Sequence, residues 1–193
     1  MTAQSPPMPA DDATAPTQGA DPVPDGAVTI APLGGSADGA AFAALVWEFF
    51  DGLRARYPEM HEALDTYITL EDLAGGLDRL VTEGPPEGSA FLLARIDGEP
   101  AGCIMFKRKT ADTCEMNRLF VPARARGRGI GRALALRLLE EARVQGYRHM
   151  VLDAFDRHEE ALPLYRSLGF VPEPDPSDYI RSTPGALSLR LAL

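Results

Sequence analysis

The chain has 193 residues, of which 45% are hydrophobic and 24% are charged, and its formal net charge is −9. This composition is ordinary for a single globular domain, and two cysteines are too few for a scaffold built on disulfides and favour a reducing compartment. The negative charge argues against nucleic acid or an anionic membrane as a partner, and we see neither a secretory leader nor an apolar run of the roughly 18 residues that cross a bilayer, so we expect a cytoplasmic protein.

The N-terminal segment differs in composition from the rest of the chain. Residues 1–26 are rich in Pro, Ala, Asp and Thr and carry almost no large apolar side chains. Such a segment buries too little surface to offset its ordering entropy. We therefore expect a disordered acidic tail over residues 1–26 and one folded domain over residues 27–193.

Apolar spacing predicts the elements of the domain. The expected strands cover 27–32, 89–96, 100–108, 113–121, 149–153, a short stretch from Phe170 and 186–193. The expected helices cover about 36–56, 70–81 (entered through Thr69), 129–145 and a stretch ending at Leu168. The Asp97-Gly98 pair suits a two-residue hairpin turn, so residues 89–121 form an antiparallel meander. This order of elements predicts a mixed α/β sheet in one domain.

The segment LFVPARARGRGIGRA, residues 119–133, joins a strand to a helix start through a loop dense in arginine and glycine. The first turn of a helix leaves backbone N–H groups unpaired, and its dipole favours negative charge there. Glycines at 127, 129 and 131 let the backbone approach phosphate oxygens closely. This local cationic cluster in an acidic chain suggests a small anionic ligand.

Two common phosphate-binding motifs do not fit this loop. A dinucleotide fingerprint requires Gly-x-Gly-x-x-Gly, but the last position is Arg132 or Leu134, depending on the glycine from which the count begins. A P-loop requires Gly-Lys followed by Ser or Thr, and the sequence has no such tripeptide. The spacing that fits is Arg126-x-x-Gly129-x-Gly131.

This spacing resembles the signature [Gln/Arg]-x-x-Gly-x-[Gly/Ala] of the GNAT superfamily of N-acetyltransferases. The preceding strand at 115–121 is also similar to that family, and ALPLYRSLGF at 161–170 is similar to its Ala-x-x-Leu-Tyr-x-x-x-Gly-Phe. The resemblance covers about residues 27–193. It implies a GNAT-like α/β fold, with a mixed, mostly antiparallel central sheet flanked by about four helices.

The resemblance also implies a cosubstrate, acetyl-coenzyme A, whose pyrophosphate would lie in the loop and whose pantetheine arm would lie beside the preceding strand. The cofactor-binding residues that it implies are Leu119, Val121, Arg126, Gly127, Arg128, Gly129, Ile130, Gly131, Arg132, Ala133 and His158. The family often has Asn at the last of these positions. His158 could donate a hydrogen bond in its place or serve only as a surface or capping residue.

Acetyl transfer to an amine requires that the amine lose a proton and that the departing thiolate gain one. The family usually achieves this by direct attack, and no Gly-x-Ser-x-Gly elbow is present. Tyr165 is the candidate general acid, because a phenol with a pKa of about 10 stays protonated. Its alternative role is core packing, since it shares a helical stripe with Ala161, Leu164 and Leu168.

Glu115 is the candidate base, acting directly or through water. Strand alternation places Glu115, Asn117, Leu119 and Val121 on one face, which we expect to face substrate. A solvated strand carboxylate is the alternative. The three histidines lack metal-ligand spacing, so we expect no metal.

The expected activity is transfer of an acetyl group from acetyl-coenzyme A to an amine of a small molecule or peptide, in a ternary complex. Acidic residues in the first helices would suit a cationic acceptor: Glu48, Asp51, Glu59, Glu62 and Asp65. The alternative is a non-catalytic acyl-coenzyme A sensor or interaction module on the same fold. Whether the chain forms a homodimer stays open.

Overall fold

A seven-stranded sheet runs through the computed structural model of the chain, which describes residues 26–70, 73–157 and 161–193. Its strands are β1 (Val28–Pro32), β2 (Ala90–Ile96), β3 (Glu99–Arg108), β4 (Thr113–Phe120), β5 (His149–Phe155), β6 (Val171–Pro172) and β7 (Ala186–Ala192). The α-helices are α1 (Ser36–Arg56), α2 (His61–Leu70), α3 (Leu73–Glu83), α4 (Ile130–Val144), α5 (Leu162–Ser167) and α6 (Asp178–Ser182). Short 3-10 turns, η1 (Pro58–Met60) and η2 (Ala123–Ala125), follow α1 and β4.

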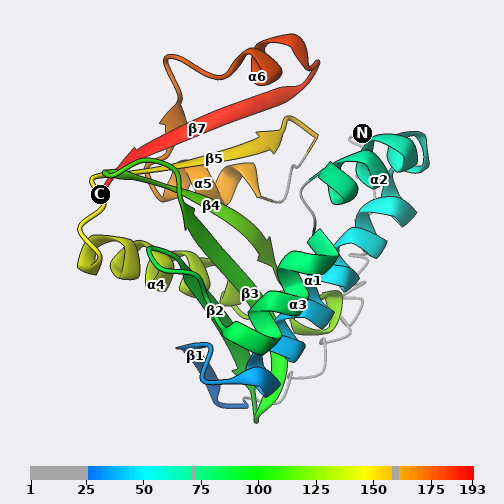
Figure 1. Cartoon of the computed structure of the whole chain (residues 1–193), viewed down its shortest axis with the longest axis vertical. Coiled ribbons are helices and arrows are strands. Elements are labelled where there is room, and N and C mark those ends of the chain that lie inside the picture. The colour runs from blue at the N-terminus through cyan, green and yellow to red at the C-terminus, as the bar shows by residue number, and fades with distance from the viewer. Residues whose placement is uncertain (1–25, 71–72, 158–160) are drawn as a thin grey trace, which may run out of the picture.

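The strands lie in the order β1-β2-β3-β4-β5-β7-β6 (Figure 1). Every neighbouring pair is antiparallel except β4 and β5, which run parallel because α4 connects them. The expected mixed, mostly antiparallel sheet is therefore confirmed. The hairpin between β2 and β3 turns through Asp97 and Gly98 with φ values of 50° and 88°, as the sequence predicted.

Each face of the sheet has its own apolar core. On one face α4 packs against β2, β3 and β4, with Leu134 and Leu138 fully buried, and α5 and Phe170 extend this core. On the other face α1 and α3 cover β2, β3 and the end of β4 through residues such as Phe42 and Leu77. We call these the α4 face and the α1 face.

Two of the helices were not expected. The predicted entry at Thr69 is wrong, because Thr69 lies inside α2 and its hydroxyl donates to the Asp65 carbonyl at 2.8 Å. Helix α6 lies in a segment for which the sequence predicted neither a helix nor a strand, and Ser177 caps it by accepting from the Ile180 amide. Residues 1–25 of the predicted tail lie outside the described residues. Among the described helices, none has both the length and the apolar character that a membrane span needs.

Candidate acetyl-transfer site

Strands β4 and β5 begin as neighbours and then separate. Their pairing ends at Glu115 and Val151, although β4 continues to Phe120 and β5 to Phe155. Figure 1 shows the two arrowheads pointing apart. Within the described chain, the part of β4 beyond Glu115 therefore has no pairing partner in β5, and the sheet is split near its middle.

A β-bulge interrupts β4 where the two strands separate. Cys103 of β3 is opposite Phe120, whereas Met105 is opposite Asn117, so β4 has one extra residue between these pairs. Arg118 lies in this stretch with a φ of 58°, a left-handed conformation that is uncommon for a residue with a side chain.

The bulge changes which side chains share a face of β4. Met116 lies in the core of the α4 face, and Leu119 and Val121 pack against that same core. Glu115 and Asn117 alternate with Met116 and therefore lie on the α1 face. The expectation that Glu115, Asn117, Leu119 and Val121 share one face is thus wrong, because the extra residue reverses the alternation partway along the strand.

The loop after β4 presents a row of backbone amides. Among the described residues, none of the amides from Gly127 to Arg132 donates a hydrogen bond, and the first amide of this region held within α4 is that of Ala133, which donates to Gly129 at 3.0 Å. Gly127 and Gly129 have φ values of 78° and 72°, and a Cβ on either would meet no atom within 4 Å. The N-terminus of α4 is therefore an open row of unpaired N–H groups, which we call the amide cradle.

The arginines of the loop fix its shape. The Nε of Arg126 donates to the Val121 carbonyl at 3.1 Å, and so folds the loop back on the end of β4. A guanidinium nitrogen of Arg132 donates to the Ser167 hydroxyl at 2.8 Å, which connects the first turn of α4 to the end of α5. Arg128 is half-buried within the same loop.

Tyr165 lies on α5, on the α4 face. Its ring packs edge-on against Phe170, with the centroids 6.0 Å apart, and contacts the core of that face. Burial raises the pKa of Tyr165 to about 12. Its hydroxyl makes no hydrogen bond to any residue in the described part of the chain. Tyr165 is thus a packing residue whose hydroxyl stays protonated.

Glu115 lies on the α1 face, opposite to Tyr165 across the sheet. Its carboxylate pairs with the Lys109 ammonium at 3.3 Å, and its side chain is 29% exposed. The carboxylate is thus accessible and close to one cation.

The remaining predicted site residue, His158, lies outside the described residues. Within residues 26–70, 73–157 and 161–193, no cluster of His, Cys, Asp and Glu could hold a metal ion. Both cysteines are free and buried, and burial raises the pKa of the Cys103 thiol and brings that of Cys114 to about 12.

One turn of α1 contacts the end of β4 and the loop that follows. Consecutive residues of the helix meet side chains from the bulge, the end of the strand and the loop. The contacts are an ion pair between Glu48 and Arg124 at 2.6 Å, packed rings of Phe49 and Phe120 at 5.8 Å, and Arg118 over the ring of Phe50 at 5.1 Å. This turn of α1 therefore holds the separated end of β4.

The end of α1 contacts the end of β5 through Arg157. Its guanidinium lies over the rings of Tyr57 and Phe155, 5.2 and 5.4 Å from their centroids, and pairs with Glu59 at 3.3 Å. The Tyr57 hydroxyl donates to the Arg157 carbonyl at 3.4 Å. We call these four residues the Arg157 clasp. No local sequence signal marks Arg157, because its partners Tyr57 and Glu59 lie about 100 positions away in the chain.

The acidic residues of the first helices are largely paired with arginines. Arg54 pairs with Asp51 at 3.3 Å and with Asp65 at 2.8 Å, and Glu59 belongs to the clasp. Their charge is therefore mostly compensated within the protein. This pairing weakens the argument that these side chains select a cationic acceptor.

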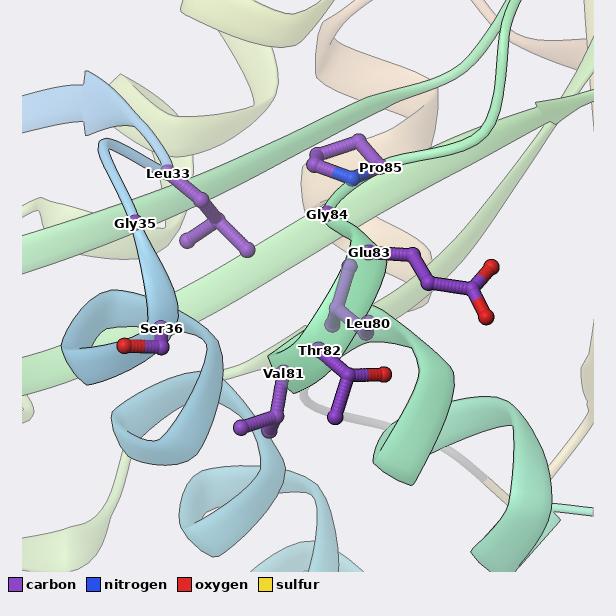
Figure 2. A pocket seen from close by; sticks show the side chains of 9 residues that line it. All are labelled: Leu33, Gly35, Ser36, Leu80, Val81, Thr82, Glu83, Gly84 and Pro85. Atoms are coloured by element: carbon purple, nitrogen blue, oxygen red, sulfur yellow. The ribbon is translucent and has the colours of Figure 1, made fainter.

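A pocket of about 230 Å³ lies away from the separated strands, between the start of α1 and the end of α3 (Figure 2). Its lining residues are Leu33, Gly35, Ser36, Leu80, Val81, Thr82, Glu83, Gly84 and Pro85. None of the predicted site residues borders it, so it is separate from the candidate site.

The model of the acetyltransferase (GNAT) family matches residues 46–170, which include β4, the amide cradle and Tyr165. Curated relatives include an uncharacterized N-acetyltransferase of Dictyostelium discoideum, 41% identical over 80 residues, and human N-acetylaspartate synthetase, 40% identical over 86 residues. These matches cover 42% and 44% of this chain but only 37% and 28% of the relatives.

Solved structures match over a larger share of the chain. PaiA N-acetyltransferase from Thermoplasma acidophilum, in complex with coenzyme A, superposes with a TM-score of 0.64 at 17% identity, covering 86% of this chain and 99% of that one. A ribosomal-protein-alanine N-acetyltransferase from Brucella melitensis gives a TM-score of 0.60 at 22% identity, covering 86% and 99%. At these identities the likeness concerns the fold.

Proposed function

Because the chain belongs to the acetyltransferase (GNAT) family and is therefore an acyltransferase, we propose that it moves an acetyl group from acetyl-coenzyme A to an amine by direct attack in a ternary complex. The observation that carries the proposal is the row of unpaired amides from Gly127 to Arg132, next to two strands that separate. A pyrophosphate supplies the negative charge and acceptor oxygens that such a cradle lacks.

The proposed donor contacts lie on the α4 face. The amides from Gly127 to Arg132 would bind the pyrophosphate, and the exposed ends of nearby arginines would add charge-assisted hydrogen bonds. The edge of β4 next to Leu119 and Val121, which β5 leaves unpaired, would hold the pantetheine amides. Ile130 and Ala133 would contribute backbone contacts and packing at the start of α4. His158 stays a proposed donor contact without a described position.

The proposed mechanism divides the proton transfers between the two faces. Acetyl-coenzyme A supplies the thioester carbon: a C–N bond forms there as the C–S bond breaks. Glu115 takes the proton of the attacking amine, directly or through water, from the α1 face. Tyr165 gives its proton to the thiolate from the α4 face, and a pKa of about 12 keeps its hydroxyl protonated at neutral pH. With the base on one face and the acid on the other, the amine can lose its proton on the acceptor side while the thiolate gains one on the donor side.

The proposed acceptor is a primary amine of a small molecule, or a peptide N-terminus or lysine. The relatives named N-acetylaspartate synthetase match 44% of this chain, which keeps a free amino acid among the candidates. An amine screen therefore includes aspartate beside polyamines, lysine and short peptides.

Donor binding tests the cradle directly. Calorimetry would compare the native chain with Gly129→Glu and with Gly98→Glu, since both glycines have a positive φ and open space at the Cβ position. Gly98 lies in the distant β2–β3 hairpin, so it controls for backbone strain. We expect acetyl-coenzyme A to lose affinity at least tenfold in Gly129→Glu only. Equal affinity in all three proteins would remove the cradle assignment.

Turnover distinguishes the enzyme from the sensor. Thiol release from acetyl-coenzyme A would be followed across the amine screen, with Tyr165→Phe as the comparison. Donor binding with no release for any amine would favour a non-catalytic sensor on the same fold.

A further inference from the structure

We propose that Arg157 is a positioning residue for the acceptor. It fixes the end of α1 and η1, beside which an acceptor would approach the acetyl group. The inference rests on the proposed function and adds a role for a residue outside the motifs of the loop and of α5. Its basis is the Arg157 clasp, whose contacts join the end of α1 and η1 to the end of β5.

An acceptor would reach the separated strands from the α1 face. The amide cradle, α5 and the side chains of Leu119 and Val121 all belong to the α4 face. A donor bound there occupies that side of the separated strands. The acceptor is therefore left with the α1 face, where Glu115 lies.

Helix α1 lies over the α1 face where the strands separate. Helix α1 contacts the end of β4 at residues 48–50 and reaches the end of β5 at Tyr57. At about 1.5 Å of rise per residue these contacts are roughly 11–14 Å apart, whereas paired strands lie about 4.8 Å apart. The second half of α1 thus bridges the ends of the separated strands, and an acceptor passes beside it.

Arg157 fixes this half of α1 to the end of β5 mainly through its ring contacts. The side chains of Arg157 and Glu59 are 36% and 65% exposed, and an ion pair this exposed contributes little by itself. The guanidinium also lies over two rings, one from each side of the junction, and these two cation–π contacts fix its position. A lysine would keep the charge, but its compact ammonium lacks the planar group that contacts both rings at once.

Loss of the Arg157 clasp should affect binding of the acceptor and leave binding of the donor unchanged. Release of the clasp frees the end of α1 and η1 from β5 but leaves the cradle, the bulge and Tyr165 in place. Acceptor binding should therefore weaken while donor binding stays unchanged.

The test measures KM for both substrates in Arg157→Ala, Arg157→Lys, Tyr57→Leu and the double variant Tyr57→Leu/Arg157→Ala. Arg137→Lys is the matched control, because Arg137 is also 36% exposed and ion-paired, but on α4. We expect each clasp variant to raise the acceptor KM about five- to tenfold. The KM for acetyl-coenzyme A should change less than twofold, and the control should change neither.

The double variant makes the result specific to the clasp. Tyr57 contacts the Arg157 guanidinium through its ring and the Arg157 backbone carbonyl through its hydroxyl, and alanine keeps only the second contact. The double variant should therefore show a smaller effect than the product of the two single effects. The inference would be overturned if the clasp variants left the acceptor KM unchanged or changed both KM values equally. It would also be overturned if the two single effects multiplied in the double variant. Failure of the native chain to turn over any amine would instead refute the proposed function, and the inference with it.

Discussion

Removal of the Tyr165 hydroxyl should abolish most of the activity and leave the fold intact. The ring of Tyr165 packs against Phe170 and the α4-face core, and a phenylalanine keeps that packing. The hydroxyl makes no hydrogen bond within the described chain, so its loss leaves no buried partner unpaired. We expect Tyr165→Phe to change the free energy of unfolding by less than about 0.5 kcal/mol. Loss of a general acid typically lowers kcat by roughly 10²- to 10⁴-fold, equivalent to about 3–5 kcal/mol in the barrier.

The pH dependence gives the same variant a second readout. A tyrosine donates only while protonated, and burial raises the pKa of Tyr165 from the ordinary value of about 10 to about 12. Tyr165 should therefore cause no loss of native activity up to about pH 10. The pKa of Tyr165 is higher in the folded chain than in the unfolded chain, so ionisation of the phenol favours unfolding. The contribution of the protonated phenol to the free energy of unfolding is complete below about pH 10 and is lost as the pH rises through about 12. Alkaline urea titrations of Tyr165→Phe should not show this loss.

The assay is thiol release from acetyl-coenzyme A at saturating donor, paired with urea unfolding and donor calorimetry. A kcat within threefold of native would show that Tyr165 is not the acid. If Tyr165→Phe instead lowered the free energy of unfolding by as many kcal/mol as it raised the barrier, the residue would serve only in packing.

Glu115, Gly102 and the two buried cysteines each allow a further test by substitution or chemical modification. Glu115→Gln should lower kcat about 100-fold, while Lys109→Gln, which removes the cation beside it, should change kcat far less; equal losses would contradict the base assignment. Gly102→Ala places a Cβ 3.0 Å from a β4 carbonyl oxygen and should lower the free energy of unfolding by about 1–3 kcal/mol in urea titrations; an unchanged midpoint would contradict the close approach. Cys103 and Cys114 should resist iodoacetamide at pH 8 in the native chain, because burial raises both pKa values; alkylation before unfolding, seen by mass spectrometry, would contradict this.

The backbone of the loop before α4 could be predicted from sequence because its signals are local. Gly127 and Gly129 adopt the positive φ values that glycine allows, and α4 begins directly after them. The Asp97-Gly98 turn was identified for the same reason. In such places the residue type and its close neighbours determine the backbone, so a short motif is sufficient.

The β4 bulge could not be predicted from alternation. A period of two assumes that each residue of β4 faces one residue of β3, and Arg118 breaks that assumption. No local signal marks the break, because Arg118 is neither glycine nor asparagine. Its guanidinium lies over Phe50 of α1, so the conformation is associated with a tertiary contact that the sequence does not reveal.

The amide cradle and the α1 face differ in how many substitutions each can accept. The cradle is backbone held by α4 and by the loop that returns to Val121, so most side chains around it can change without loss of the N–H groups. The α1 face is bounded by side chains from distant segments, such as Arg157 and its partners in α1 and η1. Single substitutions there can therefore change the α1 face while the N–H groups of the cradle persist. The proposed donor site can thus stay constant while the proposed acceptor side changes, so proteins with this fold can share one donor and differ in their acceptors.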